Sequence, residues 1–261
     1  SKQIREVCDC IIIDEASMVS VQIHNQLLSA GLPVLYIGDH GQLPPIGDDP
    51  GIMRSLDSEL KTIHRQALDS PIIRYAHAIR TGDFTPINGI QHISRSHPGW
   101  LSGPFSRNPN LQCIVSLNDQ RVAINSAIRT AMKFAEPLVV GERVISLRNN
   151  YDLGIFNGDI HTVVGVPSRP GDLTTIRTPL GNEVAVNLSV PSLSLKQIPP
   201  NWDRDSQGEP FHYAYAITCH KAQGSSWREV LVVEQQCRAW SRERWLYTAV
   251  TRAEKDLTHV V

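Results

Sequence analysis

Three consecutive isoleucines followed directly by two acids constrain this chain more than any other feature. Ile11, Ile12 and Ile13 are β-branched with no polar alternation, which predicts a short strand buried on both faces of a parallel sheet. Asp14 and Glu15 then lie at the carboxyl end of that strand, where open α/β sheets bind ligands. Asp14 could hold a hydrated Mg²⁺ there, and Glu15 could orient an attacking water. The alternative is a pair of acids that only begin the next helix.

A second apolar run follows about twenty residues later. Residues 34–37 predict another short buried strand, and Gly38-Asp39 then turns the chain into a loop stiffened by two prolines. Gln42 lies on this loop, so its amide is expected beside the same sheet edge as the two acids. An amide can both donate to and accept from a phosphate oxygen and a water molecule.

The run IIIDEAS followed by GDHGQLPPIG resembles motifs II and III of superfamily 1 helicases, specifically of the RecD-like and Dda-like branch. The resemblance implies an α/β fold of RecA-like parallel-sheet domains that binds ATP and Mg²⁺. In that setting Asp14 and Glu15 are the Walker B pair: Asp14 binds the metal through water and Glu15 is the general base. Gln42 then senses the γ-phosphate.

Bulk composition sets wide limits. The 261 residues and 29.0 kDa allow two modest domains, and 41% hydrophobic with 20% charged residues indicate a globular protein. A net charge of −1 gives no general sign of nucleic-acid binding, so such binding would need a local basic surface. The five cysteines form no C-x-x-C pair, which disfavours zinc and favours reduced thiols. With no leader-like or membrane-length apolar run, a cytoplasmic protein is expected.

One expected part of a nucleotide site is missing from the sequence. Only ten residues precede the first strand, and no Gly-Lys pair occurs anywhere, so there is no G-x-x-x-x-G-K-[ST] phosphate loop. Either the chain is the carboxy-terminal portion of a longer protein, with a partial first RecA-like domain, or its nucleotide site has lost the phosphate cradle. The resemblance favours the first interpretation, and weak or absent ATPase activity is expected of this chain alone.

The segment after the proline loop is expected to complete the first domain. A helix is predicted from Pro71 to Arg80, with proline in its first turn and Gly82 beyond its end. Arg65 ends a short apolar stretch in a setting similar to motif IV of the family, whose arginine reaches the γ-phosphate. The alternative for Arg65 is an exposed arginine in a charged segment.

A second α/β domain is predicted to begin beyond residue 110. Residues 83–110 show no periodicity and are expected to be a linker or loop, whereas residues 113–117 predict a strand that a helix follows. From residue 137 short β-branched runs alternate with turn signals such as Asn157-Gly158, which predicts an antiparallel β-module. The resemblance implies a small SH3-like barrel inserted in the second domain. It could grip or separate nucleic-acid strands, or be a plain structural insertion.

The run TCHKAQGS resembles motif V, which joins the ATP cleft to the DNA strand in the family. A strand predicted at 213–217 would deliver the motif, and a final apolar strand is predicted at 230–233. Hydroxyl, imidazole, ammonium and amide groups suit contact with a phosphate backbone. The residues expected to bind nucleic acid are Thr218, His220, Lys221, Gln223 and Ser225. Ser226 departs from the family, since many relatives carry an acid there.

The run ERWLYTAVTRAEKDLTHVV resembles motif VI. A helix is predicted with Leu246, Val250 and Ala253 on one face, followed by a terminal strand at 257–261. The family's arginine corresponds to Arg252, and a fixed guanidinium suits the charge on a transferring phosphoryl group. The alternative is an ordinary surface arginine.

Together the motifs predict an ATP-dependent helicase that translocates on single-stranded DNA and unwinds duplexes, with 5′ to 3′ travel implied by the resemblance. The predicted domains are 1–100, then 101–136 with 209–261, and the β-module 137–208. The expected catalytic residues are Asp14, Glu15, Gln42, Arg65 and Arg252, and ATP is expected to contact these five and Gly224. Alternatives are a non-catalytic nucleic-acid-binding module and an RNA helicase. The host pathway, whether recombination, replication or conjugation, and any partner subunits stay open.

Overall fold

The computed structural model describes residues 7–60, 69–169, 171–235, 237–238 and 240–261, and its chain forms two compact units. The first unit comprises Ser1–His92, Ala222–Val230 and Gln236–His259. The second comprises Ile93–Lys221, Leu231–Gln235 and Val260–Val261. The domain boundaries drawn from the sequence stay a prediction.

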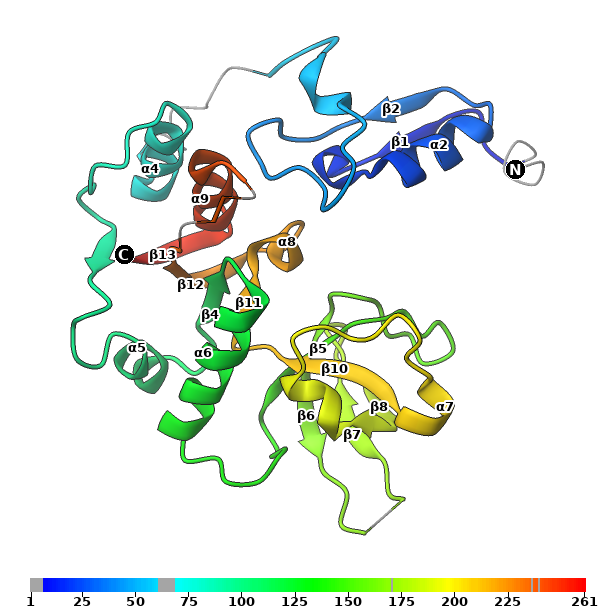
Figure 1. The fold of residues 1–261 in the computed structure, drawn as a ribbon, viewed down its shortest axis with the longest axis vertical. Coiled ribbons are helices and arrows are strands. Elements are labelled where there is room, and N and C mark those ends of the chain that lie inside the picture. The colour runs from blue at the N-terminus through cyan, green and yellow to red at the C-terminus, as the bar shows by residue number, and fades with distance from the viewer. Residues whose placement is uncertain (1–6, 61–68, 170, 236, 239) are drawn as a thin grey trace. The chain divides into compact units, whose positions relative to one another are not determined.

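Helices and short strands alternate in the first unit (Figure 1). Its elements are β1 (Ile11–Ile13), the 3-10 helices η1 (Ala16–Met18) and η2 (Ile52–Arg54), α2 (Val21–Ser29), β2 (Val34–Tyr36), α4 (Pro71–Arg80) and α9 (Arg242–Val250). Four elements contain residues of both units: β3 (Gln91–Ile93), α8 (Cys219–Ala222), β12 (Trp227–Val233) and β13 (Ala253–Val260). Among the described helices, none combines the length and the apolar character needed to cross a membrane.

The second unit carries most of the β-structure. Its elements are α5 (Ser102–Arg107), β4 (Gln112–Val115), α6 (Asn118–Ala131), β5 (Arg143–Ser146), β6 (Ile160–Gly165), β7 (Thr174–Arg177), β8 (Glu183–Val186), β9 (Leu188–Ser189), the 3-10 helix η3 (Val190–Ser194), α7 (Arg204–Gln207), β10 (Glu209–Tyr213) and β11 (Ala216–Thr218). A core of buried apolar side chains from α6, β4 and the β-module holds this unit together.

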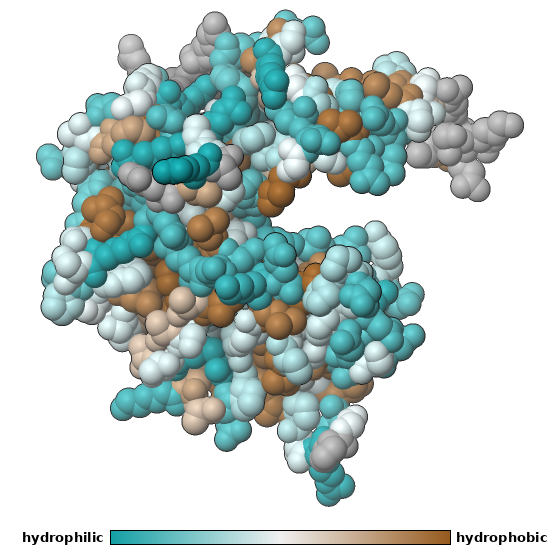
Figure 2. Space-filling model, in the orientation of Figure 1, coloured by the Kyte–Doolittle hydropathy of each residue, from teal (hydrophilic) through white to brown (hydrophobic). Residues whose placement is uncertain are grey.

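The two predicted strands at the start of the chain form and pair in parallel. Ile12 lies opposite Leu35, and the pairing continues past the strand ends because the Ala16 amide donates to the Ile37 carbonyl at 2.9 Å. The expectation that the first strand is buried on both faces is wrong for this chain. Ile12 is 61% exposed and Leu35 55%, because in the described part of the chain this sheet has two strands and one of its faces is uncovered. Apolar surface over these N-terminal elements is visible in Figure 2.

Local signals set the helices of the first unit. The hydroxyl of Ser20 caps the N-terminus of α2. The helix ends at Ser29, and Gly31 then adopts the left-handed conformation at φ 65°. Helix α4 has the predicted bounds, with Pro71 in its first turn. It packs on α9 through a buried face that includes Tyr75 and Ile79, both 0% exposed.

A five-stranded sheet has the order β11-β4-β12-β13-β3. Strands β11 and β4 run parallel with Ile217 opposite Ile114, as expected of an α/β domain. The predicted linker 83–110 is wrong in part, because it contains β3 and α5. Strand β3 is short and polar, so its hydrogen bonds to the end of the chain, and not its sequence pattern, define it: the Val261 amide donates to the Ile93 carbonyl at 3.0 Å.

The single strand predicted at 213–217 is two strands in two sheets. Tyr213 ends β10 and pairs with Val144 in the β-module, whereas Ala216 begins β11 and pairs with Cys113 in the parallel sheet. At the break between them the buried amide of Gln112 donates to the carbonyls of residues 214 and 215, both at 3.2 Å. These bonds satisfy buried carbonyl groups at the point where the strand changes sheets.

The predicted antiparallel β-module is present as a six-stranded sheet in the order β8-β7-β6-β5-β10-β9. Its pairs are antiparallel except β9 with β10, and a bulge interrupts β6 between Val163 and Gly165. In the described part of the chain β8 and β9 are the two open edges of this sheet. The sheet therefore does not close, and the SH3-like barrel part of the expectation is not found.

Candidate functional site

The two acids of motif II lie at the end of β1, where the backbone turns sharply. Asp14 is exposed, and one of its carboxylate oxygens accepts the Glu15 amide at 2.8 Å. Glu15 adopts the left-handed conformation, with φ 52° and ψ 42°. That conformation costs a residue with a side chain on the order of 1–3 kcal/mol, and such strain concentrates at functional positions. The strained residue is the one predicted to be the general base.

Gly38 allows the ends of the two strands to come together. A Cβ at this position would lie 2.9 Å from the Ala16 amide nitrogen and 3.1 Å from that of Ser17. Real Cβ atoms essentially never approach backbone so closely, so only glycine fits without a shift. Motif II and motif III are therefore neighbours at the carboxyl edge of the sheet, as predicted from the sequence.

The motif III loop is bonded to motifs V and VI within the first unit. The hydroxyl of Tyr247 on α9 donates to the Asp39 carboxylate at 2.6 Å, and the Leu43 amide donates to the Thr248 hydroxyl at 2.9 Å. The side-chain amide of Gln223 donates to the Leu43 carbonyl at 3.2 Å. Burial, and then the bond to Asp39, raise the pKa of Tyr247 to about 12, so its hydroxyl remains a neutral donor.

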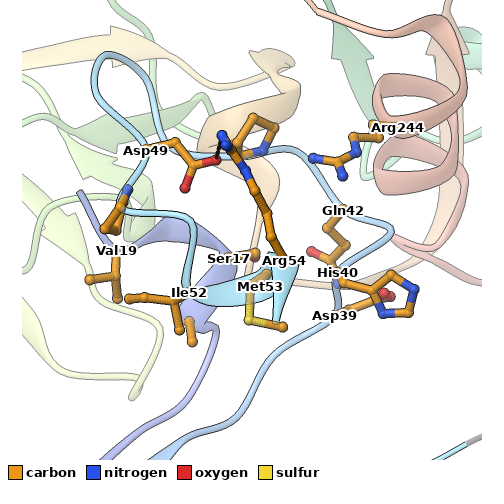
Figure 3. A pocket seen from close by; sticks show the side chains of 13 residues that line it. Ser17, Val19, Asp39, His40, Gln42, Asp49, Ile52, Met53, Arg54 and Arg244 are labelled. Carbon is orange, nitrogen blue, oxygen red and sulfur yellow. Dashed lines mark hydrogen bonds and ion pairs between the residues drawn. The ribbon is translucent and has the colours of Figure 1, made fainter. Parts of the chain in front are cut away.

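Several polar groups beside this loop have no partner in the described part of the chain. The Oε1 atom of Gln42 and the hydroxyl of Ser17 are buried without a hydrogen bond. Both residues line a pocket that Arg244 also lines, and Figure 3 shows the Arg244 side chain extending into it from α9 on the side of Gln42. Buried polar atoms of native proteins are normally satisfied, so these groups fit a site for a polar, hydrogen-bonding ligand.

The pocket also holds a fixed carboxylate. Asp49 pairs with Arg54 at 2.8 Å. The Gly51 amide, more than the arginines, lowers the pKa of Asp49. Because this carboxylate is already engaged, Arg244 is the cation of the pocket that has no ion pair among the described residues. A negatively charged group of a ligand would find its complement there.

Of the two predicted arginines, Arg65 lies outside the described residues, so its role stays a prediction. Arg252 follows the end of α9 and is 8% exposed. Its guanidinium donates to the carbonyls of Thr248 at 3.1 Å and Ser225 at 3.3 Å. These bonds join motif VI to motif V, and in the described residues no hydrogen bond or ion pair links Arg252 with the motif II acids.

The other motif V residues are divided between the two units. Thr218 ends β11, and His220 and Lys221 lie in the short helix α8. The Lys221 ammonium donates to the Asn157 side chain, which belongs to the predicted hairpin turn. Burial lowers the pKa of Lys221. In the first unit, Gly224 at φ 75° makes the turn that precedes Ser225.

The carboxylates fit a metal-bound nucleotide better than a metal alone. No cluster of three or more histidine, cysteine, aspartate or glutamate side chains could hold a metal among the described residues. Mg²⁺ in nucleotide sites is typically held by one or two carboxylates, waters and the substrate's phosphates. An exposed Asp14 with one carboxylate oxygen left open matches that requirement.

Comparisons with known proteins agree with the motifs. Residues 1–98 match the family described as an AAA domain, and residues 213–260 match the family described as a UvrD-like helicase C-terminal domain. The chain is 28% identical to the ATP-dependent RecD2 DNA helicase of Deinococcus radiodurans, over 94% of this chain. It is also 28% identical to the RecD subunit of the RecBCD enzyme of Mycolicibacterium smegmatis, over 94% of this chain. The chain is therefore similar in sequence to the RecD-like and Pif1-like helicases of superfamily 1.

Solved Pif1 structures share the fold of this chain. A Bacteroides Pif1 helicase in complex with ADP-AlF3 and ssDNA aligns over 99% of this chain and 71% of that one, with a TM-score of 0.64 at 19% identity. Pif1 from Candida albicans aligns over 100% of this chain and 74% of that one, with a TM-score of 0.51 at 19% identity. The mixed α/β, RecA-like fold class is confirmed. This RecD-like chain spans 35% of the RecD2 relative and 49% of the RecD relative.

The Ser226 side chain of motif V is hydrogen-bonded to an acid. The Ser226 hydroxyl donates to the carboxylate of Glu254 on β13 at 2.5 Å. An acid is thus placed beside position 226 by another strand, and Glu254 was not foreseen from the sequence.

Sequence reasoning also missed three further residues of the site in this RecD-like chain. Asp39 and Tyr247 were seen as parts of motifs but not as bonded partners, and Arg244 was not singled out. Arg244, Tyr247 and Thr248 lie at helical spacings of three and four, which places them on one face of α9. That spacing was the available signal, but it does not say which loop the face meets.

Proposed function

We propose that the protein containing this chain hydrolyses ATP to translocate along single-stranded DNA and to separate duplex strands, with 5′ to 3′ travel. The observation that supports this most is the joining of motifs II, III and VI within one unit. Glu15 and Gln42 lie at one sheet edge, and the loop carrying Gln42 is hydrogen-bonded to α9. This arrangement suits a site in which ATP hydrolysis shifts the motif III loop and, through its hydrogen bonds, helix α9.

The chain's own residues supply distinct steps of this reaction. Glu15 would accept a proton from the attacking water, and the Gln42 amide would hold the water and a γ-phosphate oxygen in line. Asp14 would hold Mg²⁺ through water, and that ion would neutralise charge on the phosphate oxygens. Arg252, and Arg65 as a prediction from sequence, would stabilise the charge of the transition state.

Contact with DNA is assigned to motif V. The residues proposed to bind the phosphate backbone are Thr218, His220, Lys221, Gln223 and Ser225. The hydrogen bond from Gln223 to the motif III loop supports a link between nucleotide and DNA. Gly224 would contact the nucleotide through its turn.

The phosphate cradle is proposed to lie in a longer protein. The two strands of the first sheet run parallel, and such sheets are covered on both faces in folded domains. The exposure of Ile12 and Leu35 therefore supports additional elements beside them. We expect little ATP turnover from this chain alone, and robust turnover by it would contradict this part of the proposal.

Reduced thiols fit a cytoplasmic protein.

The substitution Glu15→Gln tests the reaction in a protein that carries these residues and a phosphate-binding loop. It removes the base but keeps the size of the side chain, so DNA-stimulated ATP hydrolysis should be lost while ATP binding is kept. Asp256→Asn, a change of an exposed acid on β13, is the matched control and should hydrolyse ATP normally. Hydrolysis at the unsubstituted rate by Glu15→Gln would refute the assignment. Strand separation on matched DNA and RNA duplexes distinguishes the DNA helicase from an RNA helicase.

A further inference from the structure

Two aromatic rings stand exposed on one ordered loop of the β-module. The loop, residues 149–157, contains Tyr151, 76% exposed, and Phe156, 46% exposed. Their ring centroids are 6.2 Å apart at an interplanar angle of 71°. Large apolar side chains that gather on a surface mark a site of interaction more often than single ones do.

The backbone of this aromatic loop is closed by a two-residue bridge. The Asn150 amide donates to the Ile155 carbonyl at 2.7 Å, and the Ile155 amide donates back at 3.0 Å. Ile155 is 1% exposed and packs in the core of the second unit. The Asn150 side chain also donates to Glu209 on β10 at 2.6 Å. The two rings therefore project from a loop that is anchored at its base.

The side chain of Asn149 fixes the Tyr151 ring and the end of the loop further. The amide of Asn149 donates to the Tyr151 hydroxyl at 3.0 Å, and its oxygen accepts the Asn157 backbone amide at 2.8 Å. Binding of a ligand to these rings would carry a small entropic cost for ordering the side chains, because their positions are already set in the unbound protein. This is the property expected of a binding platform and not of a loop that only connects two strands.

Positive charge lies next to the same loop. The Lys221 ammonium of motif V donates to the Asn157 side chain, and the Arg204 guanidinium, which also pairs with Glu209 at 3.3 Å, donates to the Asn149 carbonyl at 3.2 Å. Cations beside exposed aromatic rings form the combination with which proteins bind single-stranded nucleic acid, through phosphate contact and base stacking. An acidic or purely apolar partner would match only one half of this surface.

We propose that Tyr151 and Phe156 form a stacking platform for unpaired bases of single-stranded DNA, with the strand's phosphates passing Lys221. The inclined rings present different faces, so each ring would take its own base. Stacking of this kind tolerates any base, which suits a protein that moves along DNA. The platform rests on the proposed function, since it extends the predicted motif V contact to the bases.

The test measures binding of fluorescent oligodeoxythymidine by anisotropy to the unsubstituted protein and to Tyr151→Ala and Phe156→Ala. Each alanine variant should bind about five- to one-hundred-fold more weakly, because one stacked base is lost. Tyr151→Phe keeps the stacking ring and loses only the bond from Asn149, so it should bind clearly more tightly than Tyr151→Ala. Leu180→Ala is the matched control, since Leu180 is 85% exposed in the same β-module and outside the aromatic loop.

Two further measurements identify the contact. An oligonucleotide with abasic sites should bind the unsubstituted protein more weakly but should make little difference to the double alanine variant. The slope of affinity against salt should be unchanged in the alanine variants, because the phosphate contacts remain. In Tyr151→Trp, binding should be kept and tryptophan fluorescence should be quenched by the oligonucleotide, which tests the platform even if an alanine variant fails to fold.

The outcomes separate this proposal from the function on which it rests. If the unsubstituted protein binds oligodeoxythymidine and the folded alanine variants bind it equally well, the stacking platform is overturned and the helicase proposal stands. If the unsubstituted protein binds no single-stranded DNA, the proposed function itself fails and the platform fails with it. Weaker binding that is the same for normal and abasic strands would also overturn the platform.

Discussion

Removal of the Tyr247 hydroxyl should loosen the connection between motif III and helix α9. In Tyr247→Phe the ring remains in place, where the Arg80 guanidinium lies 5.3 Å from its centroid, and the hydroxyl loses its 2.6 Å bond to Asp39 together with its contact with Arg80. A hydrogen bond to a charged group contributes about 1.5–3 kcal/mol. Asp39 retains the bond from the Gly41 amide at 2.8 Å and the site is only partly buried, so we expect the lower end, about 1.5 kcal/mol.

A double-mutant cycle isolates that value. Urea unfolding of Tyr247→Phe, Asp39→Ala and the double variant gives the coupling energy, and the loss of the Gly41 bond cancels because it occurs in both arms that lack Asp39. Tyr151→Phe is the control for a tyrosine hydroxyl on the surface, where the effect should be within about 0.5 kcal/mol. A coupling energy below about 0.3 kcal/mol, which is the error of additivity for independent sites, would refute the reasoning.

Three further changes test packing and charge in unfolding experiments. Gly38→Ala should lower the free energy of unfolding by about 1–3 kcal/mol, because the new Cβ meets the motif II backbone. Burial, and then nearby cations, lower the pKa of His212 from 6.5 to about 3. Between these two values the unfolded state binds the proton and the folded state does not, so the free energy of unfolding decreases as the pH is lowered from 6.5. At pH 5 this loss is about 2 kcal/mol, and His212→Phe should remove it. Arg129→Met leaves the Glu142 side chain, 0% exposed, without its ion pair, and should cost about 3–5 kcal/mol.

The elements that the sequence predicted well are those with local signals. Proline in the first turn and glycine beyond the end define α4 by themselves. The two β-branched runs gave the strands that carry Asp14 and the motif III loop. Such signals act within a few residues of chain and need no knowledge of the partner.

The failures occur where the partner decides the structure. The apolar run 213–217 has the composition of one strand, but Gln112 and two different sheets divide it. Strand β3 has a polar sequence and exists through its bonds with the end of the chain. The exposure of Ile12 depends on which elements lie beside β1. The sequence of β1 predicts a strand that can be buried on both faces, but it does not predict whether neighbouring elements cover it.

The candidate site divides in the same way, and the division bears on how the proposed motor would work. The positions of Asp14, Glu15 and Gln42 follow from strand ends, whereas the bonds to α9 follow from which face of that helix meets the motif III loop. Because Tyr247 and Thr248 both bond to the loop, α9 cannot move relative to it unless these bonds break, at a cost of about 1 kcal/mol or more each. A shift of Gln42 on hydrolysis would therefore be passed to α9 more readily than it would be absorbed by the loop. Arg252 lies one turn beyond Thr248 and bonds to its carbonyl, so the same movement would reposition the proposed arginine finger.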